Sequence, residues 1–440
     1  MEKESCGETF KKRYGILVQN HINHKQHSTS GLNLLFGKAE GFSQAQAAWR
    51  FYNNDNVDIA SLNKPLINEA VELIEEKCDE YLLAIHDWSH LDYRRQEKKK
   101  ECIQIKRSKN EKRYSIGYDL QSTLAISDKE GEPIVPLVQN LKTNQHTYST
   151  YKEDINQDAT HLEELQYRAR HIRKIAGITK HIVDIIDREA DSITLMRYYS
   201  KYQYNYLLRV NDRSKVRYDG ENISQIELAR SMDMGEYIKK ISYRNEEVDI
   251  YVNEVNIHIT RDAYQKIKRE DGTFGRKKVK GEAIQARFIV ERLINKEGKI
   301  VATWLLLSNL PKNVTAQKIA LWYYWRWKIE SYFKLLKSSG FNLEQWQQQD
   351  PLALFKRLLI ASYACVLVWK IEQDNTDRMQ KIKKILIRLS GRLIERGKVS
   401  TSSALLAGLW NYFSAMDLLE MYDPDELFSI RDELREVMGL

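Results

Sequence analysis

Two short, largely apolar runs that each end in an aspartate constrain the fold of this chain more than any other feature. They are Tyr81–Asp87 and His181–Asp187. Runs of this kind are typical of strands buried within a sheet. Because functional side chains gather where the strands of an α/β sheet end, both acids are candidate site residues. The two runs therefore predict an α/β fold with a site at one edge of the sheet.

The surrounding segments predict the order of the remaining elements. Strands are expected at Ile116–Ile126, Ile134–Val138 and Tyr204–Val210, and helices at His161–Ile175 and 189–200. The turn Asp128–Gly131 favours a hairpin between the second and third strands. The order is then three strands, helix, strand, helix, strand. This is the order of the ribonuclease-H-like plan, which we take as the expected fold of a catalytic domain at residues 76–375.

Residues from about 215 to 310 interrupt that plan. Strand-like alternation recurs there at Val248–Ile259, Ala286–Leu293 and Val301–Leu307. The same interval carries the basic loop Gly275–Gly281, and we interpret it as a β-rich insertion in the catalytic domain. Residues 1–75 and 376–440 have helical spacing, and Asp423 is expected to begin a last helix. The chain is therefore predicted to be an α/β protein with helical N- and C-terminal regions on either side.

The composition is ordinary for a globular protein, with a modest excess of positive charge. Lys and Arg number 69 against 61 Asp and Glu, a formal net charge of +8. This excess favours an anionic partner without establishing one. The N-terminus lacks a signal-peptide pattern. The longest apolar run, Leu358–Trp369, is too short to span a bilayer, so we expect a buried helix and no membrane partner.

The cysteines give an expectation about the compartment. They are far apart in the sequence and form no C-x-x-C pair: Cys6, Cys78, Cys102 and Cys365. This spacing argues against a disulfide framework and against a zinc site. We therefore expect a protein of the reducing cytoplasm.

One expected helix, Tyr323–Lys337, carries an unusual set of polar residues. At about 100° per residue, Arg326, Glu330 and Lys337 fall within roughly 60° of arc, counted from Tyr323. An apolar stripe lies beside them and consists of Trp322, Ile329, Phe333 and Leu336. A carboxylate can bind a metal, and Arg and Lys can bind phosphate. The helix favours metal-dependent chemistry on a nucleic acid, although a solvated face with one Arg–Glu pair is an equal alternative.

Three carboxylates can complete such a site. If the strands ending in Asp87 and Asp187 are neighbours, the two acids converge, and Glu330 can supply a third carboxylate. Three clustered carboxylates cannot all be comfortably ionised unless divalent cations neutralise them. Mg²⁺ or Mn²⁺ prefers these oxygen ligands, and two ions about 3.5–4 Å apart suit phosphodiester chemistry.

Other interpretations of the acids and histidines remain open. Each aspartate alone is more often a structural strand-end residue than a ligand. Asp184 and Asp191 compete with Asp187, but Asp184 lies in mid-strand and Asp191 can support the next helix. The segment His86–His90 has histidines four apart, as in a zinc protease. It leaves a strand, however, and lacks the expected glutamate, so this alternative is weak.

Taken together, these residues resemble the DDE transposases of the insertion-sequence-four family of bacteria. The family's helix pattern is Y-x2-R-x3-E-x6-K, which Tyr323, Arg326, Glu330 and Lys337 match at every spacing. The family's second acid lies in a D-R-E-A-D segment, which is Asp187–Asp191 here. The resemblance covers residues from about 40 to 375.

The resemblance implies cut-and-paste transposition through hairpin intermediates. Asp87, Asp187 and Glu330 would be the catalytic metal ligands, with Mg²⁺ or Mn²⁺ and two ions. Tyr323, Arg326 and Lys337 would hold the DNA backbone. Trp304 would stack on a displaced base, with a core tryptophan as an equal alternative. Arg50 in the helical N-terminal region and Arg209 after the fifth strand would also contact DNA.

The implied partners are double-stranded DNA and a second copy of the chain. Transposon ends are inverted repeats, so a twofold dimer acting on transposon ends and target DNA is expected in a nucleoid-associated protein. Candidate dimer residues, which could equally pack within the chain, are Leu405, Leu409, Trp410 and Tyr412. The alternative functions are a ribonuclease-H-like nuclease or resolvase and a non-catalytic regulatory DNA-binding copy.

Overall fold

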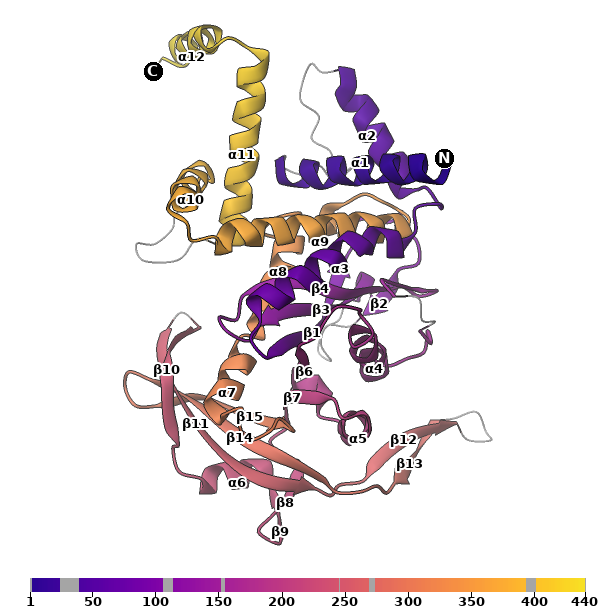
Figure 1. Cartoon of the computed structure of the whole chain (residues 1–440), viewed down its shortest axis with the longest axis vertical. Coiled ribbons are helices and arrows are strands. Elements are labelled where there is room, and N and C mark those ends of the chain that lie inside the picture. Colours follow the sequence, from indigo (N-terminus) through magenta and orange to yellow (C-terminus); the bar gives the residue numbers. More distant parts are fainter. Residues whose placement is uncertain are drawn as a thin grey trace.

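A large mixed sheet with helices packed mainly at one end organises the protein (Figure 1). The computed structural model describes residues 2–23, 39–105, 114–151, 155–244, 246–268, 274–392 and 401–439. Within these residues the sheet has 13 strands, and its main path is β5-β4-β3-β1-β6-β7-β15-β14-β11-β8-β9. The predicted α/β class is confirmed at this level.

The centre of the sheet contains the five strands expected between residues 81 and 210. They are β1 (Tyr81–Asp92), β3 (Ser115–Ser127), β4 (Pro133–Lys142), β6 (His181–Ile186) and β7 (Asn205–Arg209). β4, β3 and β1 are antiparallel neighbours, whereas β6 is parallel to both β1 and β7. The predicted helices are present as α4 (His161–Ile172) and α5 (Ile193–Tyr202). Two short strands, β2 (Ile103–Ile105) and β5 (Thr147–Ser149), pair with β3 and β4.

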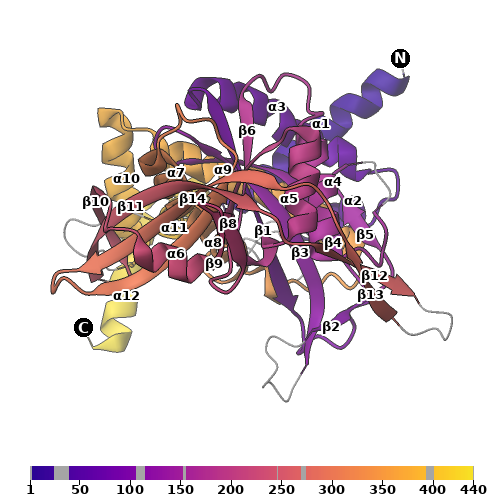
Figure 2. The same ribbon diagram turned by 90° about the horizontal axis from the view of Figure 1, so that it is seen from below.

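The predicted β-rich interval extends the same sheet. Its elements are β8 (Lys215–Tyr218), β9 (Glu221–Ser224), α6 (Gln225–Ser231), β10 (Glu236–Tyr243), β11 (Glu246–Ile259), β14 (Ile284–Asn295) and β15 (Ile300–Ser308). β15 pairs antiparallel with the edge of β7, which is why the two parts become continuous. β12 (Ala263–Lys268) and β13 (Phe274–Val279) form a separate two-stranded ribbon that projects from the body (Figures 1 and 2).

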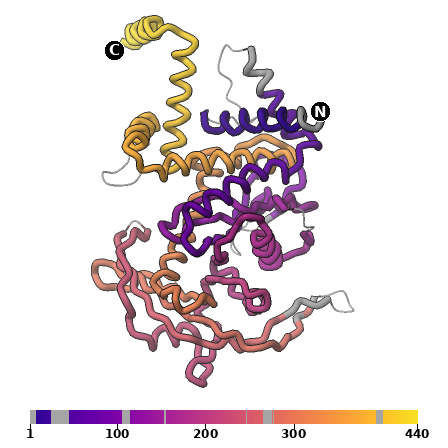
Figure 3. Tube along the Cα trace, viewed as in Figure 1, coloured from indigo at the N-terminus to yellow at the C-terminus, as the bar shows by residue number. Residues whose placement is uncertain are grey.

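The two helical regions pack against each other although they lie at opposite ends of the chain. They comprise α1 (Glu2–Asn23), α2 (Ala39–Tyr52), α3 (Ile59–Lys77), α9 (Pro351–Gln373), α10 (Asp377–Leu389), α11 (Ser402–Met421) and α12 (Pro424–Met438). The trace in Figure 3 shows α1 beside α9. The indole Nε1 of Trp410 in α11 donates a hydrogen bond of 3.1 Å to the carbonyl oxygen of His21 in α1. Asp423 caps α12 as expected, since it accepts a hydrogen bond from the backbone N–H of Asp425.

The apolar run Leu358–Trp369 belongs to the core helix α9. This helix has 23 residues, so the expectation that the apolar segment is too short for a membrane span was wrong on length. Among the described residues it is the one helix long and apolar enough to cross a membrane, but 83% of its most apolar window is buried inside the protein. Its buried Arg357 stacks on Trp346 at 3.8 Å. The expected burial of this segment is therefore confirmed.

The predicted unbroken helix Tyr323–Lys337 is interrupted. α7 (Ala316–Tyr324) ends and α8 (Trp327–Lys337) begins around a tight turn at Trp325 and Arg326. The backbone N–H of Arg326 bonds to the carbonyl of Tyr323, three residues back. The ring of Trp325 lies against Gly131, which has a φ of +66° and no room for a Cβ. This contact joins the β3–β4 hairpin to the helix junction.

Candidate active site

The three predicted acids come from three separate segments and meet at one place. The parallel pairing of β1 with β6 ends at His86 opposite Ile186. Asp87 and Asp187 are therefore the next residues of two adjacent strands. β1 itself continues past Asp87 to Asp92, so the expectation that Asp87 ends its strand was wrong. The neighbouring strand β6 does end at this point, at Ile186. Beyond its end, β1 has no parallel neighbour on that side, and the acids lie there.

Arg326 gathers the three carboxylates around its guanidinium group. Its Nη1 lies 3.6 Å from Oδ2 of Asp87. Its Nη2 lies 3.6 Å from Oδ2 of Asp187 and 3.1 Å from Oε1 of Glu330. Arg326 is buried, whereas the side chain of Glu330 is 43% exposed. We call these four residues, together with Tyr323, the Arg326 cluster.

Tyr323 and Arg209 close the cluster on the Asp187 side. The phenol of Tyr323 donates a hydrogen bond of 3.1 Å to Oδ1 of Asp187. The Nη1 of Arg209, at the end of β7, lies 3.8 Å from the same oxygen. Asp187 also accepts a hydrogen bond of 2.6 Å from the backbone N–H of Arg188, which caps a short 3₁₀ turn. With Arg326, Asp187 is thus held by four donor groups from separate segments of the chain.

Burial controls the protonation of the acids in this cluster. It raises the pKa of Asp87 to about 6, against the opposing effects of the Trp88 N–H and of Arg326, and Glu330 and Asp187 add to the rise. The pKa of Glu330 is also raised, again mainly by burial. For Arg326, burial would lower the pKa, but Tyr323 and the three carboxylates outweigh it. The cluster therefore holds more acid than its arginines readily keep ionised.

The donor atoms of the cluster are of the kind that binds a hard divalent cation. Carboxylate oxygens suit Mg²⁺ and Mn²⁺, and an excess of acids favours a cation. Within the part of the chain that the structure describes, no three His, Cys, Asp or Glu side chains form a group arranged for a metal ion. In this arrangement Arg326 is the partner that the three acids share. A common metal ion would therefore have to take the place of its guanidinium group.

Lys337 lies apart from the acids. Its Nζ donates a hydrogen bond of 2.6 Å to the carbonyl oxygen of His90 and forms an ion pair of 3.0 Å with Glu344. Lys337 lies on the same face of α8 as Glu330, since seven residues make about two turns, but those turns place it about 10 Å further along the helix. The expected polar edge therefore does not bring Lys337 into contact with the carboxylates. The apolar stripe beside that edge is confirmed, since Trp322, Ile329, Phe333 and Leu336 are all buried.

Trp304 lies in β15 behind the Arg326 cluster and is 3% exposed. Its ring makes edge contacts with Tyr323 at 5.6 Å and with Tyr243 at 5.9 Å. This is the packing of a core tryptophan, one of the two alternatives left open by the sequence. In this arrangement the indole is not open to a base. Arg50, by contrast, is exposed on α2, in the helical layer.

A second acid–base group lies three residues from Asp187, and the sequence did not predict it. Asp184 is fully buried; its Oδ1 lies 2.8 Å from Nε2 of His86 and its Oδ2 lies 2.7 Å from Nη2 of Arg173. The other ring nitrogen of His86 bonds to Thr123 at 2.8 Å. Both nitrogens are thus used, which rules against the zinc alternative for His86–His90. We call Asp184, His86 and Arg173 the Asp184 cluster.

The remaining competitor, Asp191, has a structural position. It accepts a hydrogen bond of 2.9 Å from the backbone N–H of Asn211 and forms an ion pair with Arg261. A further buried acid, Glu291, faces Trp304 across the β14–β15 pair, and neither of its oxygens has a hydrogen-bond partner among the described residues. Burial raises its pKa well above the usual range. No local sequence pattern distinguishes Glu291 from an ordinary strand residue.

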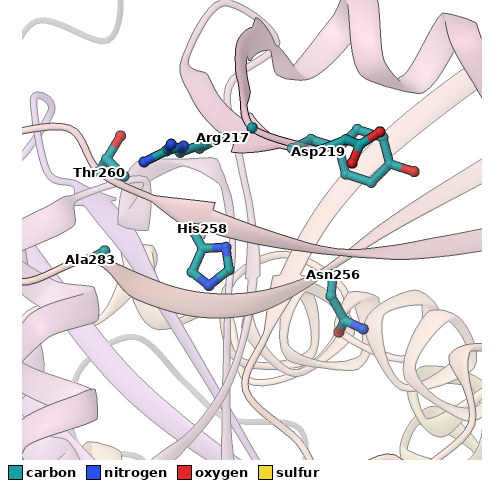
Figure 4. A pocket seen from close by; sticks show the side chains of 8 residues that line it. Arg217, Asp219, Asn256, His258, Thr260 and Ala283 are labelled. Atoms are coloured by element: carbon teal, nitrogen blue, oxygen red, sulfur yellow. The ribbon is translucent and has the colours of Figure 1, made fainter.

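A pocket of about 590 Å³ lies outside this region, on the insertion strands (Figure 4). Arg217 of β8 stands opposite His258 of β11 there, and the pocket also contains donors and acceptors from Asn256 and Thr260. None of the acids of the Arg326 cluster lines it. It lies near the point where the β12–β13 ribbon leaves the sheet.

Comparisons with known proteins give little support beyond this geometry. No protein-family model matches the sequence, and no curated protein sequence matches it. Among solved structures, the chain is similar to a piggyBac transposase, in a cryo-EM structure of its synaptic complex with hairpin DNA. The TM-score is 0.37 and the identity 11%, over 96% of this chain and 74% of the other. A TM-score this low does not establish a shared fold.

Proposed function

We propose that this chain is a DDE transposase of the insertion-sequence-four type, which cleaves and joins DNA by a cut-and-paste route with hairpin intermediates. One observation carries the proposal: carboxylates from β1, from the residue after β6 and from α8 lie within 3.6 Å of nitrogens of one guanidinium group. These are the acids that the family resemblance assigns to catalysis. The proposed substrates are the terminal inverted repeats of an insertion sequence and target DNA.

The centre of the sheet supports a ribonuclease-H-like catalytic domain. The order β4-β3-β1-β6-β7, with an antiparallel meander followed by two parallel strands, is the order expected for that plan. Ligands of open α/β sheets bind beyond the carboxyl ends of parallel strands. Asp187 follows β6 directly and Asp87 lies beside it, which is the position this rule favours.

In this proposal, Asp87, Asp187 and Glu330 hold Mg²⁺ or Mn²⁺. Two such ions, when bound, activate the attacking oxygen and stabilise the leaving oxygen of a phosphodiester. With such ions bound, the three acids would hold them, and Arg326 and Tyr323 would be released from the carboxylates to contact the phosphate backbone. Arginine suits this exchange because its planar fork binds carboxylate and phosphate alike.

The charge distribution supports DNA as the partner. The segment 260–283, which includes the β12–β13 ribbon, contains eight Lys and Arg against four Asp and Glu, and so supplies half of the net charge of +8. In the antiparallel backbone register of the ribbon, Lys266 stands opposite Arg276 and Gln265 stands opposite Lys277. A projecting basic ribbon can follow a phosphate backbone, and its affinity should fall steeply with salt. Arg50, Arg209, Lys337 and Trp304 remain proposed contacts of the same DNA.

The test is a cleavage assay on a donor plasmid that carries the coding region with its native flanking DNA. We expect Mg²⁺-dependent nicks at the element ends, followed by hairpin ends on the excised fragment. Glu330→Gln should remove cleavage, by roughly 10³-fold or more, while DNA binding persists. Glu297→Gln, the same change in an exposed turn between β14 and β15, is the matched control and should cleave normally.

The products separate the alternatives. Nicks without hairpins would indicate a ribonuclease-H-like nuclease or resolvase. Binding of the flanking DNA without cleavage in either metal would indicate a regulatory copy. Normal cleavage by Glu330→Gln would remove the basis of the assignment.

A further inference from the structure

One buried acid of the β-rich insertion, Glu291, has no polar contact that explains its position. It lies in β14 and is fully buried. Neither of its carboxyl oxygens has a hydrogen-bond partner among the described residues. Burying a polar group without a partner is unfavourable, and much more so when the group is charged. A protein that keeps such a group needs a reason for it, and a role at a functional site is one such reason.

Glu291 shares one face of the sheet with Arg209, which lies beside the Arg326 cluster. Glu291 stands opposite Trp304 in the pairing of β14 with β15. Leu306, two residues after Trp304, stands opposite Arg209 in the pairing of β15 with β7. Paired residues, and residues two apart along a strand, point to the same side of a sheet. Strand spacing and rise per residue put the Cα atoms of Glu291 and Arg209 about 12 Å apart, which the two extended side chains can bridge.

Arg209 is held only loosely at the site. Its Nη1 lies 3.8 Å from Oδ1 of Asp187, which is too far for a hydrogen bond. Burial raises the pKa of Glu291 well above its usual range, and the charge of Arg209 opposes that rise. Burial also raises the pKa of Tyr324 in α7, and Glu291 adds to that rise. Arg209 therefore lies between two carboxyl groups, Asp187 at the edge of the sheet and Glu291 inside the protein.

The two carboxyl groups can exchange this arginine only if Glu291 changes its protonation. A buried carboxylate without a partner is very unfavourable, so Glu291 keeps its proton while Arg209 stays near Asp187. A guanidinium group within hydrogen-bond distance stabilises the ionised form, because its planar fork can bond both carboxylate oxygens. The proton of Glu291 then passes to the solvent. Any change that occupies or neutralises Asp187 should therefore send Arg209 inward.

We propose that Arg209 alternates between Asp187 and Glu291, and that Glu291 is a positioning residue of the site. Once Asp187 binds a divalent cation, Arg209 moves to Glu291, which loses its proton. Asp187 is then relieved of one guanidinium group, and a negative charge is added behind the cluster. Arginine has five N–H donors, so the edge that does not face Glu291 remains available for the proposed contact with DNA.

Only the part of this inference that concerns the cation rests on the proposed function. The exchange itself depends on the charge of Asp187, so neutralising Asp187 by mutation should produce it without metal. The two parts can therefore be tested separately, with the protonation of Glu291 as the quantity that is measured in both.

The test is infrared spectroscopy of the full-length chain with ¹³C-labelled glutamate carboxyl groups, at neutral pH in EDTA. A protonated carboxyl group absorbs at a higher frequency than a carboxylate, and the label separates glutamate from aspartate. The difference between the wild type and Glu291→Gln should isolate the signal of one protonated carboxyl group. Glu297→Gln, in the exposed turn between β14 and β15, is the matched control and should leave that signal in place.

The Asp187→Asn variant decides the exchange without metal. We expect it to lack the signal of protonated Glu291, because Arg209 has moved inward. Asp187→Asn combined with Arg209→Gln should keep the signal, since no guanidinium group is there to stabilise the ionised form. This pair of variants identifies the signal even if Glu291→Gln does not fold. The inference is overturned if the wild type lacks the signal or if Asp187→Asn keeps it.

Adding Mg²⁺ to the wild type tests the link with the proposed function. We expect the signal of protonated Glu291 to disappear, and Arg209→Gln to keep it under the same conditions. If the signal is lost in Asp187→Asn but does not respond to Mg²⁺, the exchange of Arg209 stands and a metal ion at Asp187 does not. Circular dichroism melting of each variant shows that the fold is retained.

Discussion

Asp184 lies within β6, and Asp187 of the Arg326 cluster lies three residues later, directly after the same strand. The two clusters to which these acids belong are nevertheless built in opposite ways. In the Asp184 cluster one fully buried acid has two partners, His86 and Arg173, at 2.8 and 2.7 Å. In the Arg326 cluster three acids share one guanidinium group at 3.1 to 3.6 Å. The first cluster has two basic residues for one acid, whereas in the second three acids face two arginines, Arg326 and Arg209.

The pKa values follow this difference. Burial would raise the pKa of Asp184, but Arg173 and His86 outweigh burial and lower it. The pKa of His86 is lowered to about 4 by burial, so this histidine is neutral and donates from Nε2 to Asp184. The pKa of Asp87 is instead raised to about 6. A saturated cluster stabilises the fold, whereas an unsaturated one keeps capacity for a cation.

The Asp187→Asn variant should show the largest effect and tests whether Asp187 serves catalysis and not stability. We expect cleavage of the donor plasmid to fall by roughly 10³-fold or more, because a metal-binding carboxylate is lost. Thermal stability should stay the same or rise, since like-charge repulsion is relieved and asparagine still caps the turn at Arg188. A clear fall in melting temperature would instead show that Asp187, like Asp184, stabilises the fold.

Asp184→Asn should produce the opposite pattern. Removing this charge leaves Arg173 largely buried without its carboxylate, at a cost of about 3 kcal/mol in unfolding free energy. Urea denaturation of the two variants beside the wild type measures the difference. If Asp184→Asn were as stable as the wild type and inactive, Asp184 would be a member of the site.

The pH dependence sharpens the comparison further. The pKa of Asp87 is about 6 in the folded chain and near 3.9 when unfolded, so between these values the folded state binds more protons. The stability contributed by protonated Asp87 is present at low pH and is lost as pH rises to about 6. In EDTA, the stability of Asp87→Asn relative to the wild type should therefore increase by on the order of 1–2 kcal/mol from pH 4 to pH 7.

Denaturation of both proteins across that pH range checks this difference. Asp423→Asn, which changes an exposed helix cap of the same type, provides the control and should show no such rise. If the difference in unfolding free energy between Asp87→Asn and the wild type did not change with pH, Asp87 would be ionised over the whole range, as Asp184 is.

The smallest effect is expected for Lys337→Gln. This lysine is already satisfied by His90 and Glu344, so the loss in unfolding free energy should be about 1 kcal/mol. Its proposed contact with DNA predicts in addition that the slope of log affinity against log salt falls by about one. An unchanged slope would leave Lys337 with a structural role only.

Particular residues show how far the sequence could predict the site. Short apolar runs placed Asp87 and Asp187 on strands, and the parallel register then brought them side by side. Helical spacing placed Arg326 and Glu330 together because four residues make about one turn. The same spacing kept Lys337 on the face of α8 that carries Glu330, but two turns separate the two residues, so Lys337 binds His90 and Glu344 instead of the acids. Nothing local in the sequence marks Arg173 or Glu291, because their surroundings depend on how neighbouring elements pack.

The sequence by itself determined the order of strands and helices, the burial of the apolar stripes and the approach of Arg326 to Glu330, because these follow from periodicity and local geometry. Only the tertiary structure decided which acids are saturated and which are not. Asp184 and Asp187 are alike in the sequence, yet Asp184 is fully buried between two close partners, whereas Asp187 is 36% exposed and shares Arg326 with two other acids. That difference arises from tertiary packing, since the partners come from β1, β7, α7, the turn before α8 and the residue after α4.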